Sequence, residues 1–375
     1  MNHRVTKARM IFQASELDQL IGAIRSENYR IIGPVIQDGA ITLTEIERAD
    51  DLPVGKTDQQ SPGKYRISDR SDEAFFGYHV GSSSMKNFLH VPRSLLYQAH
   101  RDSNGDVSFR AKPSEVPRFA FIGMRSCDLH ALEILDKVLL EGPEKDESYA
   151  ALRKEMLIVA VNCTEMGATC FCDSMGTGPA VSSNCDILLT EVLGDDYHFF
   201  AAESGSEAGR RLIEKVPVQK ADELQAECVN AMLVRASNPH RRLDSAAVYQ
   251  LLTENLEHRE WGMVAARCLS CGNCTMVCPT CFCTSVQESS DLDGKLAERY
   301  RMWDSCFSVR YSYIHGGAVR PTVRARYRQW LLHKFATWQD QFGTSGCTGC
   351  GRCITWCPVG IDVTEEIRVL QETTT

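Results

Sequence analysis

The chain has 375 residues, of which 43% are hydrophobic and 24% charged, a composition typical of a folded globular protein rather than a disordered one. Its formal net charge of -8 disfavours nucleic acid as a partner, because phosphate binding needs a positive face. No run approaches the roughly 20 apolar residues of a membrane-spanning helix, and the start, MNHRVTKARM, lacks the apolar segment of a signal peptide. We therefore expect a cytoplasmic protein that binds neither nucleic acid nor membrane.

The first half of the chain has the pattern of an α/β fold. Apolar runs predict buried strands, and residues at three- and four-residue spacing predict helices between them. The expected strands cover residues 119–123, 156–163, 185–193 and 197–202, and the expected helices cover 129–140 and 206–216. Strands that alternate with helices favour a mixed or mostly parallel sheet.

The pattern changes near residue 237. Residues 241–268 have helical periodicity, and the remainder alternates helical stretches with cysteine loops, without a convincing strand. We therefore predict an α+β or α/β domain over residues 1–236. It is followed by an all-α, helical ferredoxin-like dicluster domain over residues 237–375.

Seventeen cysteines set this chain apart, and eight of them belong to one repeated motif. CLSCGNCTMVCP (268–279) and CTGCGRCITWCP (347–358) share the form C-x2-C-x2-C-x3-C-P. In two-cluster ferredoxins the first three cysteines hold one [4Fe-4S] cluster, and the fourth binds the other cluster. Crossed ligation gives Cys268, Cys271, Cys274 and Cys357 for the first cluster, and Cys278, Cys347, Cys350 and Cys353 for the second. Zinc is disfavoured because a zinc site explains neither the third cysteine nor the proline.

Four further cysteines predict a third [4Fe-4S] cluster in the N-terminal domain. Cys163, Cys170 and Cys172 lie together in NCTEMGATCFC, and Cys127 lies in the loop MRSCD. Both loops follow predicted strands, and such loops can meet at one edge of a sheet. The alternative for Cys127 is a packed core residue. Three leftover cysteines are alternative ligands or neighbours of a cluster, namely Cys281, Cys283 and Cys306.

Motifs for substrate chemistry are missing from the sequence. No G-x-G-x-x-G follows a predicted strand, and no nucleophile triad or H-E-x-x-H pair is present. We therefore assign no catalytic residue.

The long cysteine motifs resemble a known family. The segments are RCLSCGNCTMVCPTCFC, WDSCF, HGGAVRP, FGTSGCTGCGRCITWCPVGID and, upstream, FIGMRSCDLHAL and NCTEMGATCFCDSMGTGP. Together they look like the beta subunit of cytosolic bidirectional [NiFe] hydrogenases of the sulfhydrogenase type, from about residue 75 onward. The A subunit of anaerobic sulfite reductases is a related chain with the same dicluster plan.

This resemblance implies an electron-transfer subunit without an active site of its own. Its partners would be a flavin subunit that handles NAD(P)H through FAD and the small and large subunits of a [NiFe] hydrogenase, or else the subunits of a sulfite reductase. An iron-sulfur redox regulator is a third possibility from a different class. It is disfavoured because the sequence contains no DNA-binding helix pair.

Overall fold

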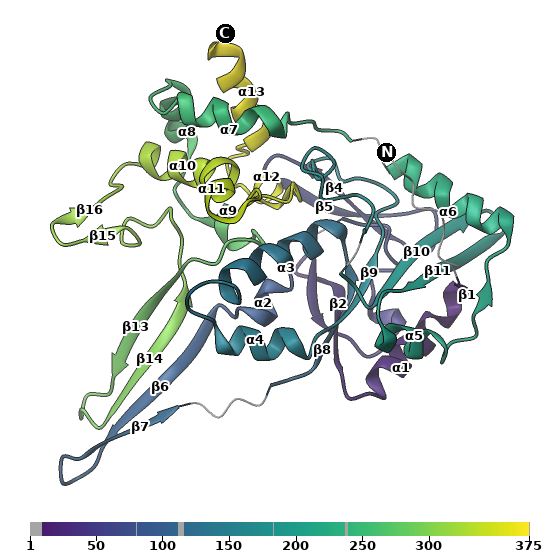
Figure 1. The fold of residues 1–375 in the computed structure, drawn as a ribbon, viewed down its shortest axis with the longest axis horizontal. Coiled ribbons are helices and arrows are strands. Elements are labelled where there is room, and N and C mark those ends of the chain that lie inside the picture. Colours follow the sequence, from purple (N-terminus) through teal and green to yellow (C-terminus); the bar gives the residue numbers. More distant parts are fainter. Residues whose placement is uncertain (1–9, 80, 112–115, 183, 237–238, 375) are drawn as a thin grey trace.

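The computed structural model describes residues 10–79, 81–111, 116–182, 184–236 and 239–374 and centres on an eight-stranded sheet (Figure 1). The strand order is β12-β1-β11-β10-β9-β8-β2-β3. Neighbours among β2, β8, β9 and β10 are parallel, and the outer pairs are antiparallel. The strands are β1 (Met10–Gln13), β2 (Arg30–Gln37), β3 (Ala40–Glu45), β8 (Phe119–Met124), β9 (Leu157–Val161), β10 (Ile187–Gly194), β11 (Tyr197–Ser204) and β12 (Gln219–Lys220). The predicted strands and the mixed sheet are thus confirmed.

Helices cover both faces of this sheet, which explains why β8 and β9 read as unbroken apolar runs. One face packs on α1 (Leu17–Arg25) and α5 (Glu207–Ile213). The other packs on α2 (Lys86–Leu89), α3 (Ser126–Leu139) and α4 (Glu147–Lys154). Helix α6 (Glu223–Ala236) contacts β10, and two 3-10 turns, η1 (Ala14–Glu16) and η2 (Ala49–Asp51), complete this part. The predicted helices 129–140 and 206–216 correspond to α3 and α5.

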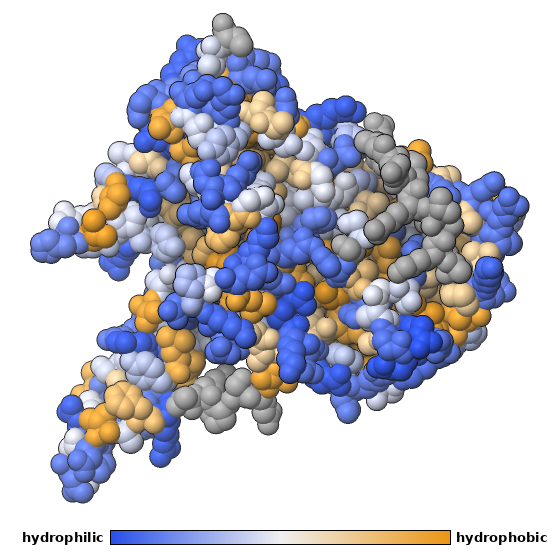
Figure 2. Space-filling model, viewed as in Figure 1, coloured by the Kyte–Doolittle hydropathy of each residue, from blue (hydrophilic) through white to orange (hydrophobic). Residues whose placement is uncertain are grey.

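A four-stranded antiparallel sheet forms an arm that projects from the body (Figure 1). Its order is β13-β14-β6-β7, with β6 (Arg93–Arg101), β7 (Val107–Ala111), β13 (Thr284–Ser290) and β14 (Leu296–Trp303). The expectation of no strands after residue 237 was therefore wrong. β13 is TSVQESS and largely exposed, so it lacks the apolar alternation that marks a half-buried strand. Figure 2 shows apolar residues among polar ones on this arm, where Phe109 is 69% exposed.

The C-terminal helices enclose a second core around the cysteine motifs. They are α7 (Ser245–Glu254), α8 (Glu260–Arg267), α9 (Asn273–Met276), α10 (Val323–Leu332), the π-helical turn η3 (His333–Thr337), α11 (Trp338–Phe342), α12 (Arg352–Thr355) and α13 (Val363–Thr374). Trp261, Tyr327, Trp330 and Ile354 are buried in this core. Two small hairpins complete the fold. One pairs β4 (Lys56–Ser61) with β5 (Lys64–Asp69) and contacts β3 and α12, and the other pairs β15 (Tyr313–Ile314) with β16 (Gly317–Ala318).

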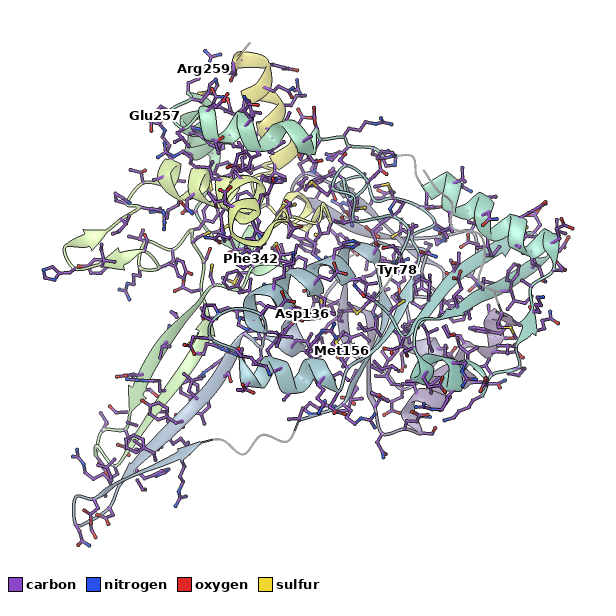
Figure 3. The ribbon with its side chains drawn as sticks, in the orientation of Figure 1. Tyr78, Asp136, Met156, Glu257, Arg259 and Phe342 are labelled. Carbon is purple, nitrogen blue, oxygen red and sulfur yellow. The ribbon has the colours of Figure 1, made fainter. Side chains whose placement is uncertain are left out.

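The N-terminal and C-terminal halves are in close contact. The arm pairs β14 with β6, and Lys137 on α3 donates to the carbonyl oxygen of Phe342 at 3.1 Å. Figure 3 shows Phe342 near α3, the helix that carries Asp136. The domain boundary between residues 236 and 237 stays a prediction, since this sheet draws strands from both sides of it. Among the described residues, no helix has the length and apolar character needed to cross a membrane.

Candidate metal centres

The two cysteine motifs have the same local structure. Gly272 and Gly351 both adopt a left-handed backbone, with φ of 76° and 75°. Each glycine immediately precedes a one-turn helix, α9 or α12, that carries the third cysteine of its motif, Cys274 or Cys353. A left-handed residue is the natural place for glycine because it has no Cβ. The sequence repeat is therefore a structural repeat.

Equivalent backbone amides point at the first sulfur of each motif. The amide of Ser270 donates to Cys268 Sγ at 3.4 Å, and the amide of Gly349 donates to Cys347 Sγ at 3.4 Å. A donor aimed at sulfur favours the thiolate, which is the form that binds metal. Such donors also set the reduction potential of an iron-sulfur cluster.

Thiols from both motifs line one cavity. Its wall combines Cys268, Cys271 and Cys274 of the first motif with Cys357 of the second. Apolar side chains close the rest of it, among them Phe307, Tyr327, Trp330 and Ile361. The wall thus includes the four cysteines expected for the first cluster under crossed ligation, and Cys353, which is expected to bind the second cluster, lines the cavity as well. Thiols from two motifs around one mainly apolar space fit a cubane cluster in donor type.

A buried lysine, Lys334, lies near two cysteines of the second predicted set, Cys278 and Cys347. Burial lowers the pKa of Lys334, but the thiolates of Cys278, Cys281 and Cys347 raise it by more. Its Nζ donates to Thr280 Oγ1 at 2.5 Å and to the carbonyl oxygen of Gly346 at 3.1 Å. A buried ammonium favours negative charge nearby, and the pKa of Cys278 is held well below its usual range, first by a hydrogen bond with Cys281 and then by the charge of Lys334. The pKa of Cys353 is raised by burial and then by the thiolates of its predicted co-ligands, which lie close by: Cys347, Cys278 and Cys350.

Removing this buried charge is expected to make the second cluster harder to reduce. Lys334→Met should shift its midpoint potential by roughly 50–100 mV to more negative values, the size of one charge a few ångströms away in a medium of intermediate dielectric constant. Arg324→Met is the matched control, because it removes one positive charge from an exposed site on α10 that pairs with Glu257. Potentiometric titration followed by EPR measures both variants. Equal shifts in the two would contradict a local role for Lys334.

The third predicted group gathers at the carboxyl edge of β8 and β9. Cys127, Cys170 and Cys172 form one buried cluster with Met166, and Cys350 packs against it. Cys127 is the second residue of α3, which follows β8, and the two strands are parallel neighbours, so their ends meet at one edge. Burial raises the pKa of Cys170, and Cys172 and Cys163 raise it further, which places Cys163 near the same group.

Two loops join this third group to the second motif. The amide of Phe171 donates to the carbonyl oxygen of Gly349 at 2.8 Å, and Thr177 Oγ1 donates to that of Thr348 at 2.6 Å. Cys170 Sγ donates to the carbonyl oxygen of Cys350 at 3.7 Å. The TCFC loop of the N-terminal half therefore lies directly against the CTGCGRC loop.

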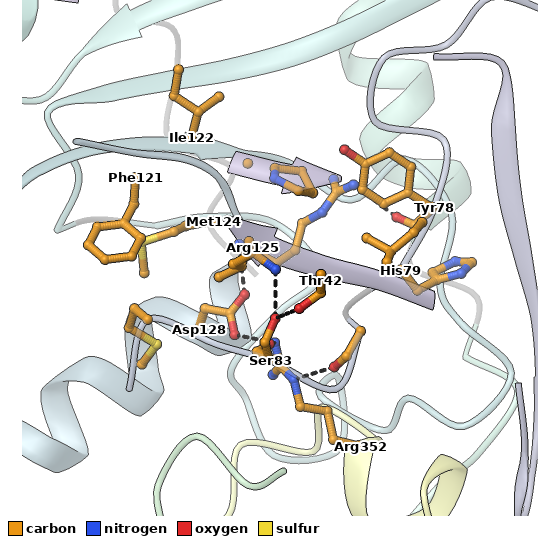
Figure 4. Close-up of a pocket in the computed structure, with 16 residues that line it drawn as sticks. Thr42, Tyr78, His79, Ser83, Phe121, Ile122, Met124, Arg125, Asp128 and Arg352 are labelled. Atoms are coloured by element: carbon orange, nitrogen blue, oxygen red, sulfur yellow. Dashed lines mark hydrogen bonds and ion pairs between the residues drawn. The ribbon is translucent and has the colours of Figure 1, made fainter. Parts of the chain in front are cut away.

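A buried ion pair between Arg352 and Asp128 reinforces this junction (Figure 4). Arg352 Nη2 is 2.8 Å from Asp128 Oδ1, and Arg352 Nε donates to the carbonyl oxygen of Gly81 at 2.9 Å. Burial lowers the pKa of Arg352, whereas Asp128, Cys350 and Cys127 raise it by more. The guanidinium therefore sits between thiols of the second and third groups. Sequence reasoning missed this residue, and its position inside CGRC was the available signal.

The leftover cysteines occupy other places. Cys281, Cys283 and Cys306 lie near the base of the arm rather than with Cys127. Cys185 packs against the core that includes α3, and Cys228 packs against the one beneath α6. Within the described ranges, no three His, Cys, Asp or Glu side chains converge closely enough to hold a single metal ion.

Residues 267–361 match the family model of a 4Fe-4S dicluster domain. Over 347 residues the chain is 29% identical to the sulfhydrogenase 2 subunit beta of Pyrococcus furiosus, an alignment that covers 92% of each protein. These findings confirm the predicted resemblance to sulfhydrogenase beta subunits and the predicted class, an iron-sulfur electron-transfer protein.

Proposed function

We propose that this chain relays single electrons within a hetero-oligomeric oxidoreductase, between a flavin subunit that handles NAD(P)H and a [NiFe] hydrogenase small subunit. The cavity lined by thiols of both motifs carries this proposal, because it brings together the four predicted ligands of the first cluster, with Cys353 of the second predicted set beside them. The name of the related protein, a sulfhydrogenase subunit beta, supports the hydrogenase partner.

Three [4Fe-4S] clusters are proposed for this relay. The first takes Cys268, Cys271, Cys274 and Cys357, the second takes Cys278, Cys347, Cys350 and Cys353, and the third takes Cys127, Cys163, Cys170 and Cys172. Each bound cluster would accept and release one electron at a time. The contact between the TCFC loop and the second motif supports a relay that extends into the N-terminal half.

The protein residues supply spacing, shielding and charge. Trp330, Tyr327 and Phe307 exclude water from the first site, while Lys334 and Arg352 hold positive charge beside the second and third groups. Low exposure and fixed charges are the means by which a protein sets a cluster potential. No residue is assigned to proton transfer or to substrate binding.

Iron analysis tests the third cluster. Three clusters contribute about 12 iron atoms per chain, and Cys170→Ser is expected to lower the iron content by about 4. Cys228→Ser is the control, since Cys228 lies on α6, apart from the thiol groups. Anaerobically purified variants are compared by iron content per chain. Unchanged iron in Cys170→Ser would exclude an N-terminal cluster and leave the two of the dicluster domain.

The sulfite reductase assignment predicts a different partner. Anaerobic purification of the native complex distinguishes the hydrogenase assignment from the sulfite reductase assignment, because a hydrogenase partner contains nickel and a sulfite reductase partner contains sirohaem. The name of the related protein favours the first outcome. A chain that bound a promoter and passed no electrons would instead support the regulator.

A further inference from the structure

A finger-like segment over residues 308–321 projects from the C-terminal helices, beside α10 (Figure 1). It contains the hairpin of β15 and β16, in which Ile314 pairs with Gly317. Figure 2 shows apolar side chains among polar ones on this projection. Its large apolar side chains are 47% to 64% exposed at Val309, Tyr313, Ile314 and Val319. Exposed apolar groups that gather on one projection mark an interaction site.

The finger and the helix after it are basic. Residues 305–339 contain five arginines and one lysine and no Asp or Glu, in a chain whose net charge is -8. On α10, two of these arginines pair with the exposed Glu257. Arg310 and Arg320 lie on the finger itself, and no carboxylate in the described part of the chain forms an ion pair with either of them. Their positive charge is therefore available to another molecule.

Both ends of the finger are attached to the loop of the first cysteine motif. Ser270 Oγ, on that loop, donates to the carbonyl oxygen of Phe307 at 3.1 Å. The buried Arg326 donates to the carbonyl oxygens of Arg320 and Pro321 at 3.0 and 2.9 Å. Its Nη2 also donates to Ser270 Oγ at 3.2 Å. The finger therefore begins and ends close to Ser270, which lies between two predicted ligands of the first cluster.

The first site reaches the surface at this place. Cys271, the residue after Ser270, is exposed, whereas Cys274 is not. Leu269 and Val359 are 63% and 38% exposed, and both line the same cavity as Cys271. A redox centre exchanges electrons with another protein only where the two approach closely, because the rate falls steeply with distance. An exposed, apolar edge beside the finger meets that requirement.

The composition of this surface favours a protein as its partner. Protein interfaces combine apolar and aromatic side chains at their centre with arginine, and the finger has this combination. Aliphatic side chains such as Ile314 have no counterpart on a phosphate backbone, and the negative charge of the chain disfavours nucleic acid. The partner that complements both properties presents an apolar recess bordered by carboxylates.

We propose that the finger, together with Leu269, Cys271 and Val359 at its base, docks an acidic, redox-active protein subunit against the first site. The proposal rests on the proposed relay and gives that relay one of its terminals. One electron passes between the first cluster and a flavin or iron-sulfur group of the docked subunit. One group is oxidised and the other is reduced by this single electron, with no bond broken.

Variants of the complex that is purified anaerobically with its native partners test the docking. Arg310→Glu/Arg320→Glu and Ile314→Asp should each raise the Kd for one redox-active subunit by about tenfold or more, measured by analytical ultracentrifugation on dilution. Flavin and metal analysis identifies the subunit that dissociates. Iron content of this chain should stay unchanged, because none of the three side chains lines the first site. Leu224→Asp, at a 69% exposed position on α6, is the matched control and should retain every subunit.

Cross-linking gives a second readout that does not depend on lost affinity. Arg310→Lys keeps the positive charge and adds an amine, which a carbodiimide joins only to a carboxylate in direct contact. We expect mass spectrometry to find an amide bond between this position and an Asp or Glu of the redox-active subunit. The complex with Arg310 unchanged should lack that cross-link.

The remaining outcomes overturn the proposal. Full retention of the subunits in both docking variants would show that the finger is not their contact. A loss of about 4 iron atoms per chain would show that the finger only shields the first site. Cross-links of Arg310→Lys found only between two copies of this chain would assign the finger to self-association. Binding of RNA or of anionic lipid vesicles that the charge-reversed variant loses, with the subunits retained, would assign it to those ligands.

Failure of the relay is a separate result. If the unchanged complex holds all its subunits but passes no electrons to or from this chain, the proposed function fails, whatever the finger binds. If the unchanged complex passes electrons and the two docking variants do so with every subunit bound, the docking proposal alone fails.

Discussion

Replacing Cys357 with serine is expected to empty the site of the first motif, although Cys357 belongs to the second. Cys357 lines the same cavity as Cys268, Cys271 and Cys274, and its sulfur accepts a hydrogen bond from the amide of Ile361 at 3.3 Å. The single variant should lose about 4 iron atoms per chain, and so should Cys268→Ser.

Double variants decide which thiols share a cluster. Cys357→Ser/Cys268→Ser should lose about 4 iron atoms, because both residues hold the first cluster, and Cys357→Ser/Cys347→Ser should lose about 8. If each motif held its own cluster, these two results would be exchanged. Iron content per chain therefore distinguishes crossed from uncrossed ligation, and far-ultraviolet circular dichroism confirms that each variant is folded.

Placing a side chain at Gly349, as in Gly349→Ala, is expected to push apart the loops that carry the second and third thiol groups. A Cβ at this residue would lie 2.7 Å from the backbone nitrogen and Cα of Cys172, and Gly349 has φ of +63°. The backbone of one loop must move, which breaks the hydrogen bond from Phe171 to Gly349. Crowding of a packed site and left-handed strain together should destabilise the protein by about 2–4 kcal/mol.

Gly343 provides the matched control for this substitution. It has nearly the same φ of +67°, but an added Cβ would meet no atom within 4 Å. Gly343→Ala should therefore cost only the conformational strain, about 1 kcal/mol. Thermal unfolding compares the two variants, and the magnetic interaction between the second and third clusters in EPR reports their separation. If the Gly349 and Gly343 variants unfold at similar temperatures and have similar EPR spectra, the close contact between Gly349 and Cys172 does not affect stability or cluster spacing.

Local patterns in the sequence predicted the central sheet and the dicluster motifs well. β8 and β9 are continuous apolar runs, β10 and β11 are mainly apolar, and each C-x2-C-x2-C motif is a local turn whose glycines mark left-handed positions. These features depend on neighbours a few residues apart, and so they can be read from one segment at a time.

The features that the sequence did not predict depend on contacts between residues far apart in the chain. β13 is polar, and it belongs to a sheet only because β14 pairs with β6, which lies in the other half. Arg352 and Lys86 are ordinary charged residues in sequence, and only the fold shows that they are buried among thiols. No local periodicity reports such long-range contacts.

The arm ties the two halves of the chain together. β14 lies between β13 and β6, so a fragment that began near residue 240 would keep only a two-stranded ribbon, with an open edge where β6 had been. Unpaired amides and carbonyls on such an edge are a template for aggregation. The same cut would remove Lys86 from the base of the arm and Asp128 from Arg352. The C-terminal half, which carries the two cysteine motifs, is therefore not an independent ferredoxin domain. It depends on β6, Lys86 and Asp128, which the N-terminal half of the same chain provides.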